Sequence, residues 1–316
     1  MGIVNRFASA PTPMAGLALG IASLGWCWEN TGLFAGKAQA LGALVAGLLL
    51  LVLAAKFLLH PHLLKADLAH PVVGSVVPTF AMATMVVSKA VGGQLGSALW
   101  LFAVALHLVF LATFAWHRAR DFQLHHMVPS WFVPPVGIIV ADVASPGGAF
   151  APLAHGLLWF GMACYALMLP LMIYRLIFRA AVPDAAKPTI AILAAPASLS
   201  LAGYLTVVPE PSLLLVALLL GIAVLMTAII YLALVTLLRL PFSPGFAAFT
   251  FPLVISATAL FKVSQLFAHW GLDVDAVAQL HLLAEVELLV ATAVVTYVAL
   301  RYALLLSPLG RLRLAA

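Results

Sequence analysis

The chain has 316 residues, of which 65% are hydrophobic and only 8% charged, with a formal net charge of +5 and a mean hydropathy of +1.17. Soluble domains carry about 25% charged residues, so this composition excludes a soluble globular protein and indicates a membrane protein with several spans. The basic residues are scattered singly along the chain, so we do not expect nucleic acid as a partner.

Windows of about 20 apolar residues predict ten transmembrane helices. They lie near residues 8–28, 38–58, 71–90, 95–116, 127–145, 152–178, 188–208, 212–238, 245–267 and 281–306. An even number of spans places both termini on one side of the membrane. With that side inside, twelve of the fifteen Lys and Arg residues are cytoplasmic and three, Lys37, Lys89 and Lys262, face out. This bias predicts that both termini are cytoplasmic.

The sequence contains few signals of covalent or metal chemistry. Cys27 and Cys164 lie in apolar segments without CxxC or Cys/His spacing, so we expect neither a disulfide framework nor a zinc site. The first apolar segment lacks a charged leader and a cleavage site, which favours a retained helix. Six histidines fall on predicted cytoplasmic loops, where we expect them to be solvated rather than to hold a metal. Because no HExxH or GxSxG motif occurs, we expect no enzymatic activity and no cofactor.

Prolines recur at matching places in alternate spans. The third, fifth, seventh and ninth spans each carry one proline at the inner end and another in the interior; the interior ones are Pro78, Pro134, Pro196 and Pro252. The intervals between them are 56, 62 and 56 residues, and one further step back falls near Ala18, between two glycines. The sequence therefore predicts a single transmembrane domain, residues 1–316, built from a helical hairpin of about 60 residues repeated five times.

These prolines also predict which helices lie inside. A proline removes a backbone donor and displaces the carbonyl four residues earlier, here those of Gly74, Ser130, Ile192 and Ala248. In hydrocarbon an unpaired carbonyl costs several kcal/mol, so these helices should be buried in protein. The even spans, of which only the sixth has an interior proline, Pro170, should form the outside. Five kinked inner helices would then surround a central, uncharged passage.

Three stretches resemble one known family: PSWFVPPVG in the fifth span, APASLSLAGYL in the seventh and AFTFPLVISATA in the ninth are similar to the tellurite-resistance protein TehA and the plant slow-type anion channels. The likeness extends from about Pro11 to Leu306. It implies an all-α membrane protein whose five hairpins stand in a quasi-fivefold arrangement around a central pore. It also implies a homotrimer, which we expect in the lipid bilayer of the bacterial inner (cytoplasmic) membrane.

The same resemblance implies a pore for small inorganic anions such as chloride or nitrate, closed by a phenylalanine of the ninth helix. The TFP match places this gate at Phe251. Phe249 lies about 200° around the helix from it, so we expect Phe249 to pack away from the passage. Ala18 stands where relatives have a proline, so the first pore wall should differ in shape.

Two lysines are candidates for attracting anions to the outer mouth. Lys262 follows Phe251 by eleven residues, which places it on the same helix face and roughly 16 Å further out. Lys89 follows the interior proline of the third span by the same distance. Two alternatives are open: both side chains anchor the helix ends at the interface, or Lys262 pairs with Glu285 or Glu287.

The sequence leaves two transport functions open. In an anion channel, selectivity would come from the cost of dehydration and from backbone dipoles. The alternative is a secondary transporter of C4-dicarboxylates, or an exporter of tellurite or other toxic anions. Carriers usually show inverted repeats and an acid at mid-membrane, whereas these repeats are parallel and His281, Glu285 and Asp142 are predicted near the outer surface. This pattern favours the channel.

Overall fold

The computed structural model describes residues 7–307, and in this part of the chain every regular element is a helix. Eight helical runs there are long and apolar enough to cross a membrane: Lys37–Leu59, Val73–Val91, Gly93–Arg120, Gly148–Phe178, Asp184–Val207, Leu213–Leu237, Pro244–His269 and Val274–Leu306. The first and fifth expected spans correspond to shorter helical segments, Met14–Trp28 and Pro129–Val143. The protein is therefore an all-helical, multi-pass membrane protein.

The even spans form single long helices on the outside of the bundle. They are α3 (Lys37–Leu59), α7 (Gly93–Arg120), α10 (Ala151–Phe178), α12 (Leu213–Leu237) and α14 (Val274–Leu306). Only 28–33% of the residues in their apolar windows are buried. The remaining apolar side chains of these helices are available to lipid or to neighbouring proteins.

The odd spans lie inside and are mostly broken into several pieces. They are α2 (Met14–Trp28); α5 (Val73–Val76) with α6 (Thr79–Val91); η3 (Pro129–Phe132), α8 (Val133–Val136), η4 (Gly137–Ile139) and α9 (Val140–Val143); η6 (Asp184–Ala194) with α11 (Ala195–Val207); and η7 (Pro244–Phe249) with α13 (Thr250–His269). Three of these odd segments are long enough to count as a full membrane span, and 67–83% of the residues in their apolar windows are buried. Their helices contact one another in a closed cycle, α2–α6–α9–α11–α13–α2.

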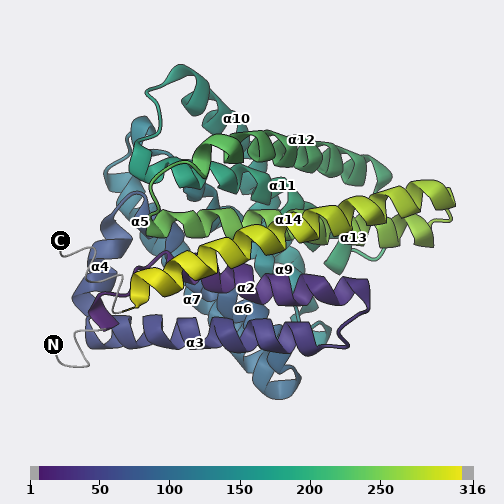
Figure 1. The fold of residues 1–316 in the computed structure, drawn as a ribbon, viewed down its shortest axis with the longest axis horizontal. Helices are drawn as coiled ribbons and strands as arrows, with labels where there is room; N and C mark the ends of the chain where they lie inside the picture. The colour runs from purple at the N-terminus through teal and green to yellow at the C-terminus, as the bar shows by residue number, and fades with distance from the viewer. Residues whose placement is uncertain (1–6, 308–316) are drawn as a thin grey trace.

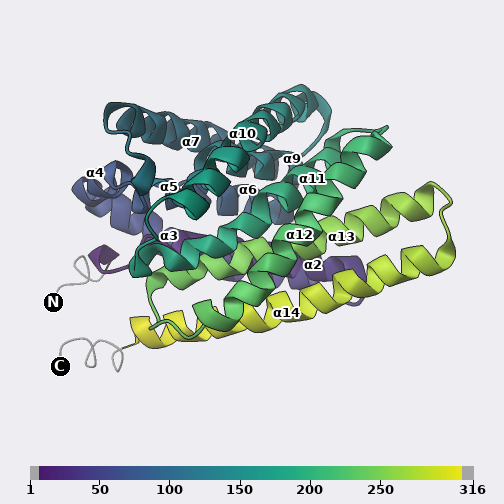
Figure 2. The same cartoon turned by 90° about the horizontal axis from the view of Figure 1, so that it is seen from above.

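Short elements join the spans: η1 (Glu29–Thr31), α4 (Pro61–Ala69), η2 (Leu124–His126) and η5 (Gly148–Phe150). Figures 1 and 2 show that α2 begins at the same end of the bundle at which α14 ends, beside α4. We call this end the terminal side and the opposite end, where the α2–α3 and α13–α14 connections lie, the distal side. Both ends of the described chain are thus on one side, as an even number of spans requires.

Each interior proline lies where a new α-helix begins. Pro134 and Pro196 are the second residues of α8 and α11, Pro252 is the third residue of α13, and Pro78 directly precedes α6. The first N–H groups of an α-helix have no acceptor within the helix, so a proline in the first turn removes no hydrogen bond. The chain therefore uses these prolines as helix starts after a preceding turn or 3₁₀ segment.

The 3₁₀ segments also supply partners for carbonyls that the prolines would leave free. The carbonyl of Ser130, four residues before Pro134, accepts the backbone N–H of Val133. The carbonyl of Ile192, four residues before Pro196, likewise accepts the N–H of Ala195. A 3₁₀ bond connects residues three apart, so it does not need the donor that proline lacks.

Outer helices donate side-chain hydrogen bonds to the broken inner backbone. His107 of α7 is fully buried, and its Nε2 lies 2.8 Å from the carbonyl oxygen of Pro134. Because a carbonyl only accepts, Nε2 carries the proton. The hydroxyl of Tyr302 on α14 donates to the carbonyl of Pro244 in the same way. Each outer helix of these two pairs thus stabilises the irregular segment that it covers.

The chain entering α2 is fixed by a buried lysine. The Nζ of Lys56 on α3 donates to the carbonyl of Ala10 at 2.9 Å and to the hydroxyl of Thr12 at 2.8 Å, and it lies 3.6 Å from the Asp67 carboxylate on α4. The Asp67 carboxylate and the two oxygen acceptors thus compensate the buried positive charge of Lys56. This network holds the start of the first inner helix against α3 and α4.

On the distal side, the turn between α2 and α3 is held by Glu29. Its carboxylate accepts backbone N–H bonds from Gly36 at 2.6 Å and Gln39 at 3.0 Å, at the N-terminus of α3. Burial acts to raise the pKa of this carboxyl, but the hydrogen bonds from Gln39, Gly36 and Ala38 outweigh it and hold the pKa below its ordinary value of 4.5. The helix dipole favours the same charged form.

Candidate functional site

An elongated cavity of about 250 Å³ opens between the inner segments on the terminal side. Every one of the five odd spans contributes to its wall, whose residues are Pro13, Gly16, Leu19, Val72, Val73, Val76, Thr79, Met82, Phe132, Val133, Val136, Gly137, Ala185, Thr189, Ile192, Ala195, Pro196, Leu199, Ser243, Pro244, Gly245, Ala247, Ala248, Phe251 and Pro252. The polar side chains in this wall are three hydroxyls, those of Thr79, Thr189 and Ser243. We call this space the inner cavity.

A second cavity, of about 70 Å³, lies towards the distal side. Its wall consists of Ser23, Trp26, Cys27, Asn30, Val140, Val143, Leu199, Phe251, Ile255, Thr258 and Lys262. We call it the distal cavity. Leu199 and Phe251 belong to both walls, so these two residues border both spaces.

The position of Phe251 follows from how α13 starts. Thr250, the first residue of α13, donates from its hydroxyl to the carbonyl of Ala247 at 2.7 Å and approaches that of Gly16 on α2 at 3.2 Å. Gly20 allows this close approach, because a Cβ there would overlap the Thr250 side chain. The first turn of α13 is therefore fixed against α2, and the next residue, Phe251, faces the cavities.

Phe249 points elsewhere, as the helical spacing predicts. It is completely buried, and its ring centre lies 4.8 Å from that of Phe246. Phe251 keeps 7% of its surface exposed, where it borders the cavities. The two phenylalanines therefore belong to different environments, one to the core and one to the interior spaces.

The four interior prolines and Ala18 differ in whether they line the inner cavity. Pro196 and Pro252 line the inner cavity, whereas Pro78 and Pro134 start their helices without contributing to its wall. Ala18 is fully buried in the middle of α2, which runs unbroken from Met14 to Trp28. The first inner segment is thus a regular helix, in contrast to the other four.

The two candidate lysines line different spaces. Lys262 lines the distal cavity, whereas Lys89 is exposed and lines a separate pocket together with Ser88 and Gly92. The Nζ of Lys89 donates to the carbonyl of Ser145 at 3.0 Å. Within residues 7–307 neither lysine forms an ion pair.

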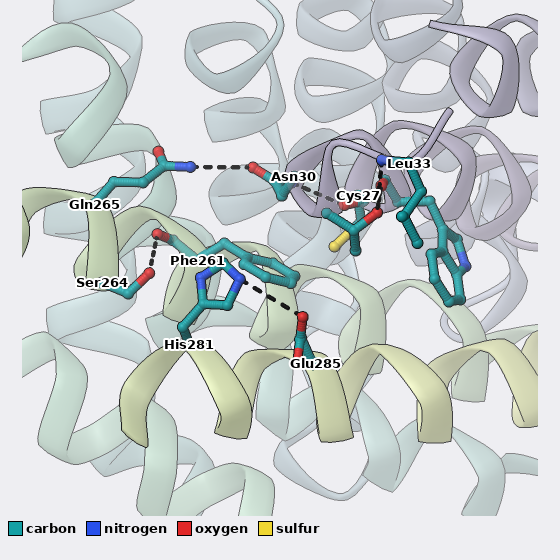
Figure 3. A network of polar contacts seen from close by, with 10 residues as sticks. Cys27, Asn30, Leu33, Phe261, Ser264, Gln265, His281 and Glu285 are labelled. Carbon is teal, nitrogen blue, oxygen red and sulfur yellow. Dashed lines mark hydrogen bonds and ion pairs between the residues drawn. The ribbon is translucent and has the colours of Figure 1, made fainter. Parts of the chain in front are cut away.

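The acidic residues considered as partners of Lys262 are engaged elsewhere. On α14, His281 Nε2 lies 3.6 Å from the Glu285 carboxylate, and the His281 ring packs against Phe261. Figure 3 shows this pair beside the link from Gln265 to Asn30 on the distal side. Glu287 points into the bundle and is only 5% exposed.

Glu287, one of the two acids expected as a possible partner of Lys262, is a buried acid of α14. Its carboxyl lies beside the Ser256 hydroxyl of α13, which in turn is 2.9 Å from the Thr227 hydroxyl of α12. One carboxyl oxygen of Glu287 has no hydrogen-bond partner among the described residues. The sequence indicates this burial: Glu285 and Glu287 are two residues apart on one helix, so their side chains cannot both face away from the bundle.

Asp142 of α9, predicted near the outer end of the fifth span, lies at the end of the segment Pro129–Val143 and is fully buried in protein. Neither of its carboxyl oxygens has a hydrogen-bond partner within the described residues. A Cβ at Gly203 of α11 would meet the Asp142 side chain at 3.6 Å, so these two inner segments pack closely here. Asp142 lines neither cavity, and neither does Glu287.

Comparison with known proteins agrees with this architecture. The model of the SLAC1 family, described as voltage-dependent anion channel, matches residues 12–303. Two proteins of Methanocaldococcus jannaschii, both named uncharacterized transporters, are similar: one is 28% identical over 66% of this chain and 69% of its own length, the other 28% identical over 63% and 66%. The match covers both cavities and all of the inner segments. The chain therefore belongs to the SLAC1 family of voltage-dependent anion channels.

Proposed function

We propose that the protein is a channel for small monovalent anions, chloride and nitrate among them, with a gate formed by Phe251. The observation that carries this proposal is the shared wall of the two cavities. Leu199 and Phe251 alone, among the described residues, line both spaces. If these side chains moved aside, the inner and distal cavities would join into one passage along the bundle.

The lining of the passage fits an anion better than a cation. Within the described residues, no carboxylate lines either cavity, and the charged group on the walls is the Lys262 ammonium. The inner cavity offers only hydroxyls and apolar side chains, so an ion must give up most of its water there. Anions that dehydrate readily are therefore favoured, and the apolar Phe251 ring blocks them when it lies across the passage.

The wider architecture belongs to the same proposal. All ten spans cross the membrane, the segments Met14–Trp28 and Pro129–Val143 included, as five hairpins in one domain with quasi-fivefold symmetry around the passage. The closed cycle of contacts among the inner helices supports this arrangement. Three copies assemble through the apolar outer helices in a bacterial inner membrane, with the terminal side in the cytoplasm.

The experiment is a comparison of purified wild-type protein with Phe251→Ala in planar lipid bilayers. Phe251→Ala should raise the basal chloride and nitrate conductance by a large factor, because it removes the ring that separates the cavities. Phe249→Ala is the matched control. It truncates a side chain of the same size two residues before Phe251, at a position that is fully buried. It should lower thermal stability, by about 3–5 kcal/mol in unfolding free energy, without opening the passage.

A carrier of C4-dicarboxylates or tellurite is a second candidate, and the buried acid Glu287 is the observation that favours it. Acids inside membrane bundles often serve as proton sites in coupled transport. Flux of malate, tellurite and chloride into liposomes with and without a proton gradient separates the two. Uptake of malate or tellurite that requires the gradient, together with a silent Phe251→Ala, would replace the channel by a carrier.

A further inference from the structure

We infer that Lys262 is the centre of a binding site for one small monovalent anion on the distal side of the gate. The inference rests on the proposed channel function and extends it by naming a resting place for the ion. The site consists of the distal cavity with Lys262 in its wall; Lys89 lies outside this wall, in a separate pocket lined by Ser88 and Gly92, and contributes only its positive charge. An anion bound there would wait immediately across Phe251 from the inner cavity.

The first argument is the contrast between the two cavities. The inner cavity is lined by residues without charge, whereas the distal cavity, although much smaller, has the ammonium of Lys262 in its wall. Phe251 and Lys262 are eleven residues apart on α13, so both lie on the helix face that borders this space. A positive charge at this point lowers the energy of an anion before it meets the apolar constriction.

The second argument is the missing counter-charge. A half-buried ammonium such as that of Lys262 is unfavourable unless a negative charge balances it. Glu29 is engaged with the start of α3 and Glu285 with His281, while the buried acids Asp142 and Glu287 do not line the distal cavity. Because no carboxylate of the described residues forms an ion pair with Lys262, a soluble anion is the natural partner.

The third argument concerns the other polar groups of the distal cavity. The Asn30 amide donates to the carbonyl of Cys27 at 2.9 Å, and the Thr258 hydroxyl donates to that of Val254 at 2.9 Å. These bonds use the Thr258 hydroxyl and one of the two N–H donors of Asn30, so among the residues of this wall Lys262 provides the one charged donor for a ligand. A single charge–charge contact of this kind attracts an anion without fixing its shape.

The size of the distal cavity selects among anions. At about 70 Å³ it has less than a third of the volume of the inner cavity, about 250 Å³. Chloride or nitrate needs little space and one positive charge at close range. A C4-dicarboxylate is longer and must place two separated carboxylates, which this small space does not favour. The site should therefore prefer small monovalent anions.

The test measures anion saturation of the open channel. In the Phe251→Ala background, single-channel currents are recorded over a range of chloride concentrations for Lys262→Gln, Lys89→Gln and the double variant. Lys262→Gln should raise the half-saturating chloride concentration severalfold, Lys89→Gln less, and the double variant most. Lys262→Arg should stay close to the parent. Lys37→Gln removes an exposed lysine of α3 that lines neither cavity and should leave the curve unchanged.

A second readout does not depend on the gate. Broadening of the ³⁵Cl NMR line by purified protein with Phe251 intact should be strong, should be displaced by nitrate but not by malate, and should be lost in Lys262→Gln. If Phe251→Ala is silent while this broadening depends on Lys262, the gate proposal fails and the anion site stands. If Phe251→Ala conducts but Lys262→Gln changes neither saturation nor broadening, the site is wrong and the gate stands.

Discussion

Phe251 on α13 and Leu199 on α11 share one position relative to the two interior cavities, because each contributes to both walls. In the proposed gate, the barrier is therefore made by side chains of two neighbouring inner helices. α11 and α13 contact one another directly in the cycle of inner segments, so a shift of either helix would change how the two side chains lie between the cavities. Leu199 is almost completely buried, which indicates that it is held firmly in place.

In the proposed gate, the place of Leu199 in both walls predicts a graded effect of truncating it. Leu199→Ala should raise chloride conductance above that of the wild type but less than Phe251→Ala does, because it removes fewer atoms from the barrier. The double variant should conduct at least as well as Phe251→Ala. The measurement is macroscopic chloride current per reconstituted protein in bilayers at fixed voltage.

Leu201→Ala is the matched control for this series. Leu201 lies two residues further along α11, is fully buried and lines neither cavity. It should cost about 2–5 kcal/mol of unfolding free energy without opening the passage. Equal conductance in Leu199→Ala and Leu201→Ala would mean that loosened packing, not loss of the barrier, produces the current.

The packing of α3 against α2 predicts different outcomes for two glycines of one helix. A Cβ at Gly42 would lie 2.8 Å from the carbonyl oxygen of Ile21 and 3.1 Å from the Cα of Gly25, both in the α2 backbone. Gly42→Ala should therefore push the helices apart and lower the thermal unfolding midpoint in detergent. A Cβ at Gly47, five residues on, meets nothing within 4 Å. Gly47→Ala should be neutral or slightly stabilising, and an equal loss in both variants would exclude the close contact as the cause.

Glu29 predicts an acid-sensitive contribution to stability. Its pKa is lower in the folded protein than its ordinary value of 4.5, so the stabilisation is present above that value and is lost as the pH falls through the folded pKa. Between about pH 6 and pH 3, the thermal midpoint of the wild type should fall more steeply than that of Glu29→Gln. Glu210→Gln, at an exposed position in the α11–α12 loop, should follow the wild type. Parallel curves for the wild type and Glu29→Gln would contradict a role for this carboxylate.

Much of the architecture could be read from the sequence because lipid imposes simple constraints on a chain. The spacing of Pro78, Pro134, Pro196 and Pro252 identified the inner segments, since backbone without regular partners must be covered by protein. The even segments, rich in Leu, Ala and Val, are the long outer helices for the complementary reason. The membership of the SLAC1 family, predicted from three short stretches, is confirmed.

The sequence was less informative about local geometry and buried charge. The interior prolines suggested kinks within long helices, but the chain places them at helix starts, and the carbonyls of Ser130 and Ile192 find partners three residues on. Leu199 carried no signal, because a leucine in a membrane helix is ordinary and only its place in the walls of both cavities distinguishes it. The burial of Glu287 and Asp142 within the bundle depends on how helices tilt and rotate against neighbours, which hydropathy does not record.

The brevity of the segment Pro129–Val143 bears on how the protein is made. It is too short to match the eight long spans, and the Asp142 carboxyl near its end opposes entry into lipid. We expect that, as it leaves the ribosome, this stretch does not settle in the bilayer alone. The 28 residues of α10, which follow after a brief connection, are apolar enough to insert and would bring the segment in with them. On this expectation the two segments are integrated as a pair, and the inner wall that carries Asp142 is completed only after its outer neighbour has been synthesised.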